Sequence, residues 1–312
     1  MTSSPPDTGD TSTGHGSPAA EIEITDQLVK DLLTGQHPDL AQYPVQQFEN
    51  GFDNVIYRLG DAYAIRLPRR AAALPFIQNE QKWLKHLRPH LPLPIPSPIR
   101  TGNPTSYYPW PWSILPWFDG TPVDEAPLSP SQAAPLARFL KALHIPAPAN
   151  APLNDARGVP IAVRQAINEE RMNRINQQID IITPEIRHLW NVALAATPDT
   201  SPTWLHGDLH ARNVLSTNGR ITAIIDWGDT CVGDRATDLA CLWSLLDCRI
   251  ARQEAMKLYG NNDPALWARS RGWAIMFGAA LLDTGLIDHP RHTTMGKKIF
   301  QRLHEDALTQ ET

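Results

Sequence analysis

The chain has 312 residues, of which 42% are hydrophobic and 20% are charged, values typical of a folded globular protein. Its formal net charge of -5 at pH 7 provides no general positive field for nucleic acid phosphates, so we expect no nucleic acid partner. The three cysteines cannot form a complete set of disulfide pairs, and they indicate reduced thiols in a cytoplasmic protein.

The first segment, residues 1–22, is rich in Ser, Thr, Pro and Gly. It lacks the apolar stretch of a signal peptide, so we expect a disordered leader. No part of the chain approaches the roughly 18 consecutive apolar residues of a spanning helix, and a membrane location is therefore not expected.

A helix and a β-hairpin are predicted next. Thr25 is a suitable N-cap for an amphipathic helix that ends near Gly35. Short β-type runs occupy residues 45–67, and two of them, 55–59 and 62–67, are separated by the turn Gly60-Asp61. These runs predict an antiparallel hairpin.

A second helix is predicted from Pro75, because apolar residues recur there at helical spacing until Pro89 closes the pattern. The proline-rich segment that follows contains two apolar runs, 95–100 and 112–118, which we interpret as short strands at sheet edges.

After Asp119-Gly120, a predicted hinge, the pattern becomes mostly helical. Asn218-Gly219, a strong hairpin signal, joins two short strands at 214–216 and 221–225. The predicted helices are 131–143, 161–178, 184–195 and the region from 238 nearly to the end. A β-rich first third and a helical remainder with one hairpin predict a bilobal α+β fold.

The run His206-Gly207-Asp208-Leu209-His210-Ala211-Arg212-Asn213 carries the clearest chemical signal. An aspartate precedes an asparagine by five residues, and the predicted hairpin then leads to Asp226. Oxygen ligands of this kind suit Mg²⁺, so Asn213 and Asp226 are predicted metal ligands. Asp208 would lie beside the metal and orient an attacking hydroxyl, as phosphoryl transfer requires.

These residues resemble the aminoglycoside phosphotransferase-like family, distant relatives of the protein kinases. The resemblance lies in HGDLHARN, the following IIDWGD and then GDRATDLA. It implies a kinase-like fold with an N-lobe at 23–116 that binds nucleotide and a C-lobe at 117–312. It also implies that Asp208 is the catalytic base, with Mg²⁺ and ATP or GTP as cofactor and co-substrate. Asp238 would support the catalytic loop.

The same resemblance implies nucleotide-binding residues in the first third. Arg66 and Glu80 fall where the family has a cation on its third strand and a glutamate on a helix, although protein kinases have lysine at the first position. A guanidinium can bridge phosphate oxygens with two hydrogen bonds. Gly51 and Asn54 would lie in the loop that covers the nucleotide. This loop lacks a G-x-G-x-x-G pattern, and a plain hairpin loop remains an alternative.

Pro116 and Phe118 are implied to contact the purine edge, through a carbonyl acceptor and an amide donor. A strand end packed in the core is an equal alternative for both residues.

His206 and His210 flank Asp208 and raise the alternative of a zinc hydrolase. The family resemblance instead makes His206 a structural residue of the loop and gives His210 no defined role.

The acceptor substrate is expected to be a small molecule bound by the helical region. An aminoglycoside or macrolide antibiotic is favoured over a metabolic alcohol, sugar or amino alcohol, and an inactive nucleotide-binding protein is a third class. Acidic residues and tryptophans are candidates for acceptor binding, although solvated helix faces and core packing explain them equally well. The acidic candidates are Asp119, Asp124, Glu125, Glu169, Glu170, Asp229 and Asp247, and the tryptophans include Trp110, Trp112, Trp117, Trp204, Trp227, Trp243 and Trp273.

Overall fold

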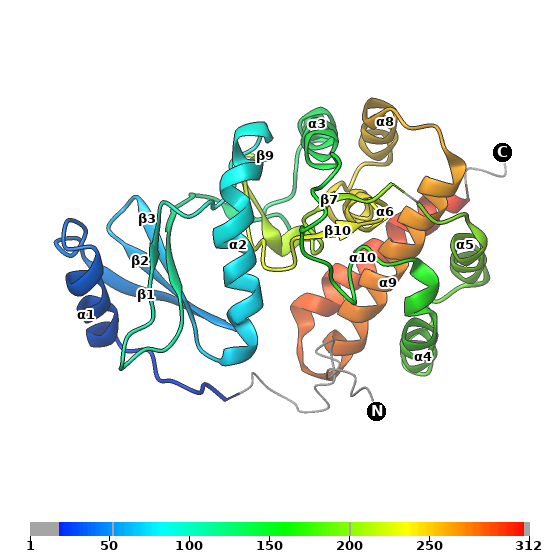
Figure 1. Ribbon diagram of the computed structural model, residues 1–312. Coiled ribbons are helices and arrows are strands. Elements are labelled where there is room, and N and C mark those ends of the chain that lie inside the picture. Colours follow the sequence, from blue (N-terminus) through cyan, green and yellow to red (C-terminus); the bar gives the residue numbers. More distant parts are fainter. Residues whose placement is uncertain (1–18, 52, 200, 309–312) are drawn as a thin grey trace, which may run out of the picture. The chain divides into compact units, whose positions relative to one another are not determined.

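The structure is a computed structural model that describes residues 19–51, 53–199 and 201–308 (Figure 1). Most of the expected leader, residues 1–18, lies outside the described residues. The chain divides into two compact units: a first unit of residues 1–82 and 97–117, and a second unit of residues 83–96 and 118–312. The mixed α+β class is confirmed.

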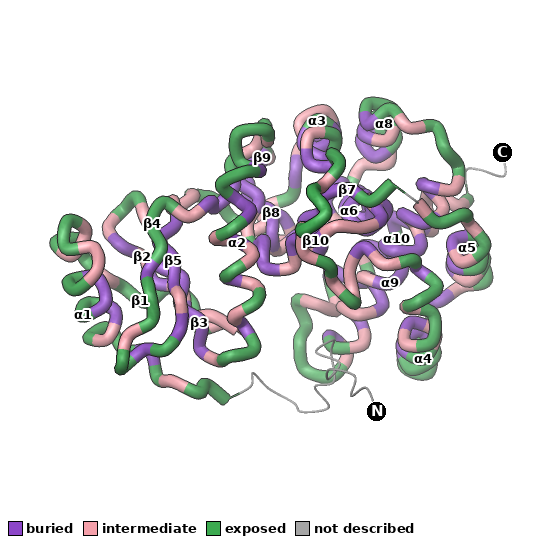
Figure 2. The backbone as a smooth tube through the Cα atoms, viewed as in Figure 1, coloured by how far each residue is buried: buried purple, intermediate pink, exposed green. Residues whose placement is uncertain are grey.

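The first unit is built on a five-stranded antiparallel sheet with the order β1-β2-β3-β5-β4. Its elements are α1 Asp26–Gln36, β1 Val45–Asn50, β2 Asn54–Leu59, β3 Tyr63–Pro68, α2 Leu74–Leu87, β4 Arg100–Gly102 and β5 Trp112–Pro116. The unit boundary falls within α2. Figure 2 shows β1 exposed along most of its length, whereas β3 and β5 are buried.

Most of the predicted elements of the first unit are confirmed. Thr25 caps α1, because its hydroxyl accepts a hydrogen bond from the Leu28 amide at 3.2 Å. The predicted strand at 95–100 is wrong, since β4 begins only at Arg100. Prolines at 94, 96 and 98 remove alternate amide donors from that segment, so it cannot pair as a regular strand.

The second unit is mostly helical. Its helices are α3 Ala133–Leu143, α4 Gln165–Asn176, α5 Pro184–Ala195, α6 Ala236–Leu239, α7 Cys241–Leu245, α8 Arg249–Tyr259, α9 Pro264–Asp288 and α10 Pro290–Ala307. Its strands are β6 Thr121–Pro122, β7 Thr203–Leu205, β8 Val214–Thr217, β9 Arg220–Ile224 and β10 Cys231–Gly233. The predicted hairpin is β8–β9, and β6, β7 and β10 were not predicted.

Gly120, in the predicted hinge, needs to be glycine. Its φ angle is +151°, and a β-carbon there would lie 2.6 Å from the Thr222 hydroxyl and 3.0 Å from the β-carbon of Leu215. The backbone therefore passes tightly against the β8–β9 hairpin at this point.

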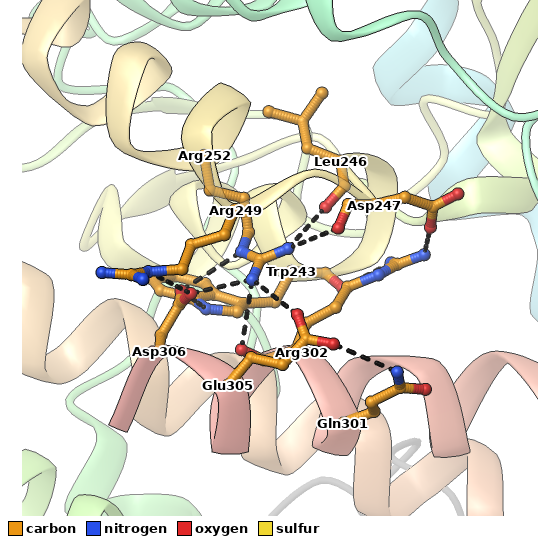
Figure 3. A network of polar contacts seen from close by, with 9 residues as sticks. All are labelled: Trp243, Leu246, Asp247, Arg249, Arg252, Gln301, Arg302, Glu305 and Asp306. Carbon is orange, nitrogen blue, oxygen red and sulfur yellow. Dashed lines mark hydrogen bonds and ion pairs between the residues drawn. The ribbon is translucent and has the colours of Figure 1, made fainter. Parts of the chain in front are cut away.

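A buried arginine joins three helices of the second unit (Figure 3). The Arg252 side chain, fully buried on α8, donates to the carboxylate of Asp306 on α10 at 2.8 and 3.2 Å. It also donates to the carbonyls of Leu246 and Asp247 after α7, at 3.0 and 2.9 Å. Trp243 Nε1 donates to the same Asp306 carboxylate at 2.9 Å. One guanidinium thus binds the carbonyls that follow α7 and also the partly buried Asp306 carboxylate.

Replacing Arg252 with alanine is expected to lower the free energy of unfolding by about 3–5 kcal/mol, because the Asp306 carboxylate, whose side chain is only 11% exposed, would lose the buried guanidinium that lies 2.8 Å from it. Urea unfolding followed by circular dichroism measures the change. Arg249→Ala is the matched control: its side chain is 39% exposed and lies 4.0 Å from Asp306, so we expect a loss within about 1 kcal/mol. Equal losses for the two variants would contradict the assigned role of Arg252.

The three cysteines differ in exposure. Cys231 and Cys241 are buried, and burial raises the pKa of both thiols. Cys248, which precedes α8, is partly exposed.

Candidate active site

The loop that begins at His206 is held in place by Asp238, a residue of α6. The Asp238 carboxylate accepts hydrogen bonds from the His206 amide at 2.7 Å and from the Gly207 amide at 2.9 Å. Gly207 has a φ of +87°, and a β-carbon there would lie 2.5 Å from the Asp229 carbonyl, so only glycine fits. The predicted support by Asp238 matches these contacts, and its functional role stays a prediction.

His206 is completely buried, and the loop uses both of its ring nitrogens. Nδ1 accepts from the Asp208 amide at 3.2 Å, and Nε2 donates to the Ile225 carbonyl at 3.0 Å. This pattern defines a neutral ring and a single tautomer. A zinc ligand needs a free ring nitrogen, so the geometry favours the structural role over the hydrolase alternative.

Two further residues support the loop and were not predicted. His144, at the end of α3, lies with Nε2 3.4 Å from the Asp238 carboxylate. Its Nδ1 lies 2.9 Å from the hydroxyl of Tyr259, the last residue of α8. Burial, with the nearby charge of Asp238, contributes to raising the pKa of Tyr259 to about 12, which keeps its hydroxyl proton available for donation. His144 therefore contacts Asp238 directly, and Tyr259 contacts His144 from the other side of the ring.

The Asp208 carboxylate has neighbours on both of its oxygens. Oδ1 lies 3.3 Å from Arg157 Nη2, and Oδ2 lies 3.3 Å from His210 Nε2. The Asn213 side-chain nitrogen donates to the Asp208 carbonyl at 2.9 Å and lies 3.4 Å from Oδ2. Burial alone would raise the pKa of Asp208, but His210 and Arg157 outweigh it and hold this pKa below its usual value. The group is thus an anion suited to orienting a hydroxyl.

The β8–β9 hairpin positions the two predicted metal ligands. Asn213 immediately precedes β8, and its carbonyl accepts from the Ile225 amide at 2.8 Å, next to Asp226. Because the Asn213 amide nitrogen already donates to Asp208, its oxygen is the atom left for a cation. Asp226 is exposed and has a φ of +57°, an uncommon left-handed conformation that often marks functional positions. This donor set fits Mg²⁺, and the metal role stays a prediction.

Asp229 is a third carboxylate near those of Asp208 and Asp226. Burial raises the pKa of Asp229, Arg157 partly opposes the rise, and the charges of Asp208 and Asp226 add to it. Asn154 donates to its Oδ1 at 3.0 Å. Such mutual repulsion among carboxylates is typical of a site that receives a cation.

In the first unit, Arg66 on β3 and Glu80 on α2 form a buried ion pair. Arg66 Nη1 lies 2.6 Å from Glu80 Oε1, and the two residues are 9% and 1% exposed. A buried pair of this kind adds little net stability compared with apolar side chains, so a functional reason is favoured. Their nucleotide-binding role stays a prediction.

The predicted nucleotide loop connects β1 and β2. The Gly51 amide donates to the Asn54 carbonyl at 2.9 Å, which closes a tight loop, while Phe52 lies outside the described residues. Asn54 Oδ1 is buried and has no hydrogen-bond partner among the residues that the structure describes.

Pro116 ends β5 opposite Tyr63, and both Pro116 and Phe118 are only half-buried. Their proposed contacts with a purine remain predictions.

Many candidates for acceptor binding are committed to contacts within the protein. Six of the seven tryptophans named above are buried, Trp117 being the half-buried one. Asp124 and Glu125 both pair with Arg291. Glu170 pairs with Arg174, and Asp247 pairs with Arg302.

His292, on α10, lies close to Arg212 in the loop that begins at His206. Its Nε2 is 3.1 Å from Arg212 Nη1, so the ring accepts from this guanidinium and is neutral. Burial, followed by the charges of Arg212, His289, His210 and Arg291, lowers the pKa of His292 to about 4.

The low pKa of His292 predicts a loss of stability in mild acid. Below about pH 6.5 the unfolded chain binds a proton at this histidine while the folded chain does not, so stability falls as the pH falls toward 4. When the pH falls from 7 to 5, the free energy of unfolding of the parent protein is expected to decrease by about 1–2 kcal/mol more than that of the His292→Gln variant. Urea titrations at both pH values measure this difference. His188→Gln, at an exposed position on α5, should behave like the parent protein; the same pH dependence in His292→Gln would contradict the prediction.

The antiparallel sheet with a buried Arg–Glu pair and the helical unit with its aspartate loop, hairpin and second aspartate are together the features of a kinase-like phosphotransferase. The chain belongs to the phosphotransferase enzyme family, whose model matches residues 44–273.

Individual relatives agree with the family and the fold. Hygromycin-B 4-O-kinase from Escherichia coli is 28% identical over 107 residues, which are 34% of this chain and 27% of that protein. The GDP complex of wild-type aminoglycoside 2'-phosphotransferase-IIIa has a TM-score of 0.63 at 18% identity, covering 92% of this chain and 100% of that chain. The apoenzyme of macrolide 2'-phosphotransferase MphH from Brachybacterium faecium has a TM-score of 0.58 at 25% identity, and the match covers 87% of this chain and 97% of that chain.

Within the described part of the chain, no helix combines the length and the apolar character that crossing a membrane would need.

Proposed function

We propose that this protein transfers the γ-phosphoryl group of ATP or GTP to a hydroxyl of a small molecule. The observation that carries the proposal is the second unit's arrangement of Asp208, Asn213 and Asp226, in which Asn213 contacts Asp208 and adjoins the strand that leads to Asp226. The acceptor oxygen forms a bond to the γ-phosphorus, the bond to the nucleoside diphosphate breaks, and the hydroxyl proton is released.

Each residue has a defined part in this reaction. Asp208 accepts the hydrogen bond of the acceptor hydroxyl and orients it. Asn213 and Asp226 would hold Mg²⁺, which would neutralise charge on phosphate oxygens when bound. In the first unit, Arg66 binds phosphate oxygens while Glu80 holds its guanidinium in place.

An antibiotic such as an aminoglycoside or macrolide is the acceptor we favour, because the named relatives act on these compounds. The test is to incubate the protein with Mg²⁺, ATP or GTP and a panel of aminoglycosides, macrolides, peptide antibiotics and small alcohols. Mass spectrometry then detects an added phosphoryl group. Phosphorylation of small alcohols alone would favour a metabolic kinase, and nucleotide binding without any product would favour an inactive protein.

A further inference from the structure

His210 lies two residues after Asp208, and the proposed function assigns it no part. Its Nε2 lies 3.3 Å from Asp208 Oδ2, at the long end of hydrogen-bond distances. Hydrogen bonds in active sites are often this long before substrates bind, and they shorten in the complex. The contact therefore raises the question of which of the two groups carries the proton.

The state of the His210 ring follows from a neighbouring amide. The Arg212 amide donates to its Nδ1 at 3.2 Å. A backbone amide can only donate, so Nδ1 carries no proton and the neutral ring carries its proton on Nε2, the atom that faces Asp208. His206 shows the same local pattern, because its Nδ1 accepts from the amide two residues later and its Nε2 donates to the Ile225 carbonyl.

The backbone around His210 is held by hydrogen bonds. The Asn213 amide donates to the His210 carbonyl at 2.9 Å, and the His210 amide donates to the Asp208 carbonyl at 3.0 Å. The Ala211 amide donates to the hydroxyl of Ser244 on α7 at 3.1 Å. The ring therefore has a defined place relative to the Asp208 carboxylate.

This arrangement makes His210 a donor to Asp208. Because Nε2 already holds the proton, the ring cannot remove a proton from Asp208 through the atom that faces it. Arg157 Nη2 lies 3.3 Å from Oδ1 of the same carboxylate, so the carboxylate has a donor at each of its two oxygens. Fixing it matters, because a displacement of about 1 Å in a reacting group can lower a rate by about 10²-fold.

We propose that His210 is a positioning residue, whose ring donates its Nε2 proton to Asp208 Oδ2 and so fixes the orientation in which this carboxylate receives the acceptor hydroxyl. The inference rests on the proposed function, because the hydroxyl is that of the proposed acceptor. It deepens that function by giving the second histidine of the loop a specific role.

Two variants separate the roles of the two ring nitrogens. In His210→Asn the side-chain oxygen can replace Nδ1 and accept from the Arg212 amide, but the amide group is too short to reach Asp208. In His210→Gln the amide group extends one bond further and can donate to Asp208. We expect His210→Asn to lower kcat about 10–100-fold, with the KM values of nucleotide and acceptor changed by less than about threefold. His210→Gln should keep kcat within about fivefold of the parent protein.

Steady-state kinetics with the nucleotide and acceptor that give product in the panel assay measures these changes. His289→Asn is the matched control, because His289 Nε2 lies 3.2 Å from the Asp288 carboxylate in an exposed pair outside the loop. It should leave kcat unchanged. A normal kcat in His210→Asn would overturn the proposal. Equal losses in His210→Asn and His210→Gln would also overturn it, because they would indicate a role that only an imidazole can fill.

Nitrogen-15 NMR of the full-length protein with labelled histidines tests the ring without turnover. Above about pH 7.5 the His210 signals, identified by their absence in His210→Asn, should show a single neutral form with the proton on Nε2. This proton should exchange with water faster in Asp208→Ala. A proton on Nδ1, a mixture of both forms or an unchanged exchange rate would refute the donor role. The expected ring state without product from any acceptor would instead overturn the proposed function and leave the contact between His210 and Asp208 established.

Discussion

Asp208→Asn is expected to lower kcat for phosphoryl transfer by about 10²–10⁴-fold, the range typical of losing a group that assists proton transfer. Asparagine has nearly the same shape, so the neighbours Arg157, His210 and Asn213 should stay in place. The missing element is the negative charge that aligns the acceptor hydroxyl. Nucleotide affinity should change little, because Asp208 lies beside the proposed metal site and is not itself a proposed ligand.

Two measurements separate these effects for Asp208→Asn. Single-turnover product formation reports the chemical step, and calorimetry with Mg²⁺ and a non-hydrolysable nucleotide reports binding. Asp155→Asn, an exposed neighbour of Arg157 in sequence, controls for the loss of one negative charge. Turnover within about tenfold of the parent protein would show that Asp208 is not the residue that orients the hydroxyl.

Asp226→Asn is expected to abolish the Mg²⁺-dependent part of nucleotide binding. The loss of affinity should exceed the roughly 10–100-fold effect of removing a residue that merely supports a metal ligand. Asparagine is the best replacement because Asp226 has a φ of +57°, and asparagine tolerates the left-handed conformation. The fold should therefore survive while a carboxylate ligand is lost.

The measurement for Asp226→Asn is nucleotide affinity with Mg²⁺ and again with EDTA. The parent protein should differ between the two conditions and the variant should not. Asn218→Asp is a matched control, since Asn218 has a φ of +52° in the turn of the same hairpin. It should keep the response to Mg²⁺. An undiminished response in Asp226→Asn would refute the metal role.

The features predicted well from sequence depend on neighbours along the chain. The β8–β9 hairpin follows from Asn218-Gly219, whose left-handed backbone suits the turn between two short strands. The first helix follows from the Thr25 cap, and the later helices follow from their apolar periodicity. The order of Asp208, Asn213 and Asp226 around this hairpin was predictable for the same local reason.

The features that were missed depend on contacts between distant segments. Arg157 reaches Asp208 across 51 positions, and His144 reaches Asp238 across 94. Neither residue has a local pattern that marks it. The strands β7 and β10 pair with one another, and each has three residues, too few for an alternating pattern.

The three cysteines differ in burial, and this difference allows selective labelling of one of them. Because Cys231 and Cys241 are enclosed and remain protonated thiols, a maleimide dye should react at Cys248 alone without any cysteine being mutated. That position precedes α8, the helix that ends in Tyr259 and through it contacts His144. A fluorophore attached there would lie at the start of α8, with the natural sequence otherwise intact.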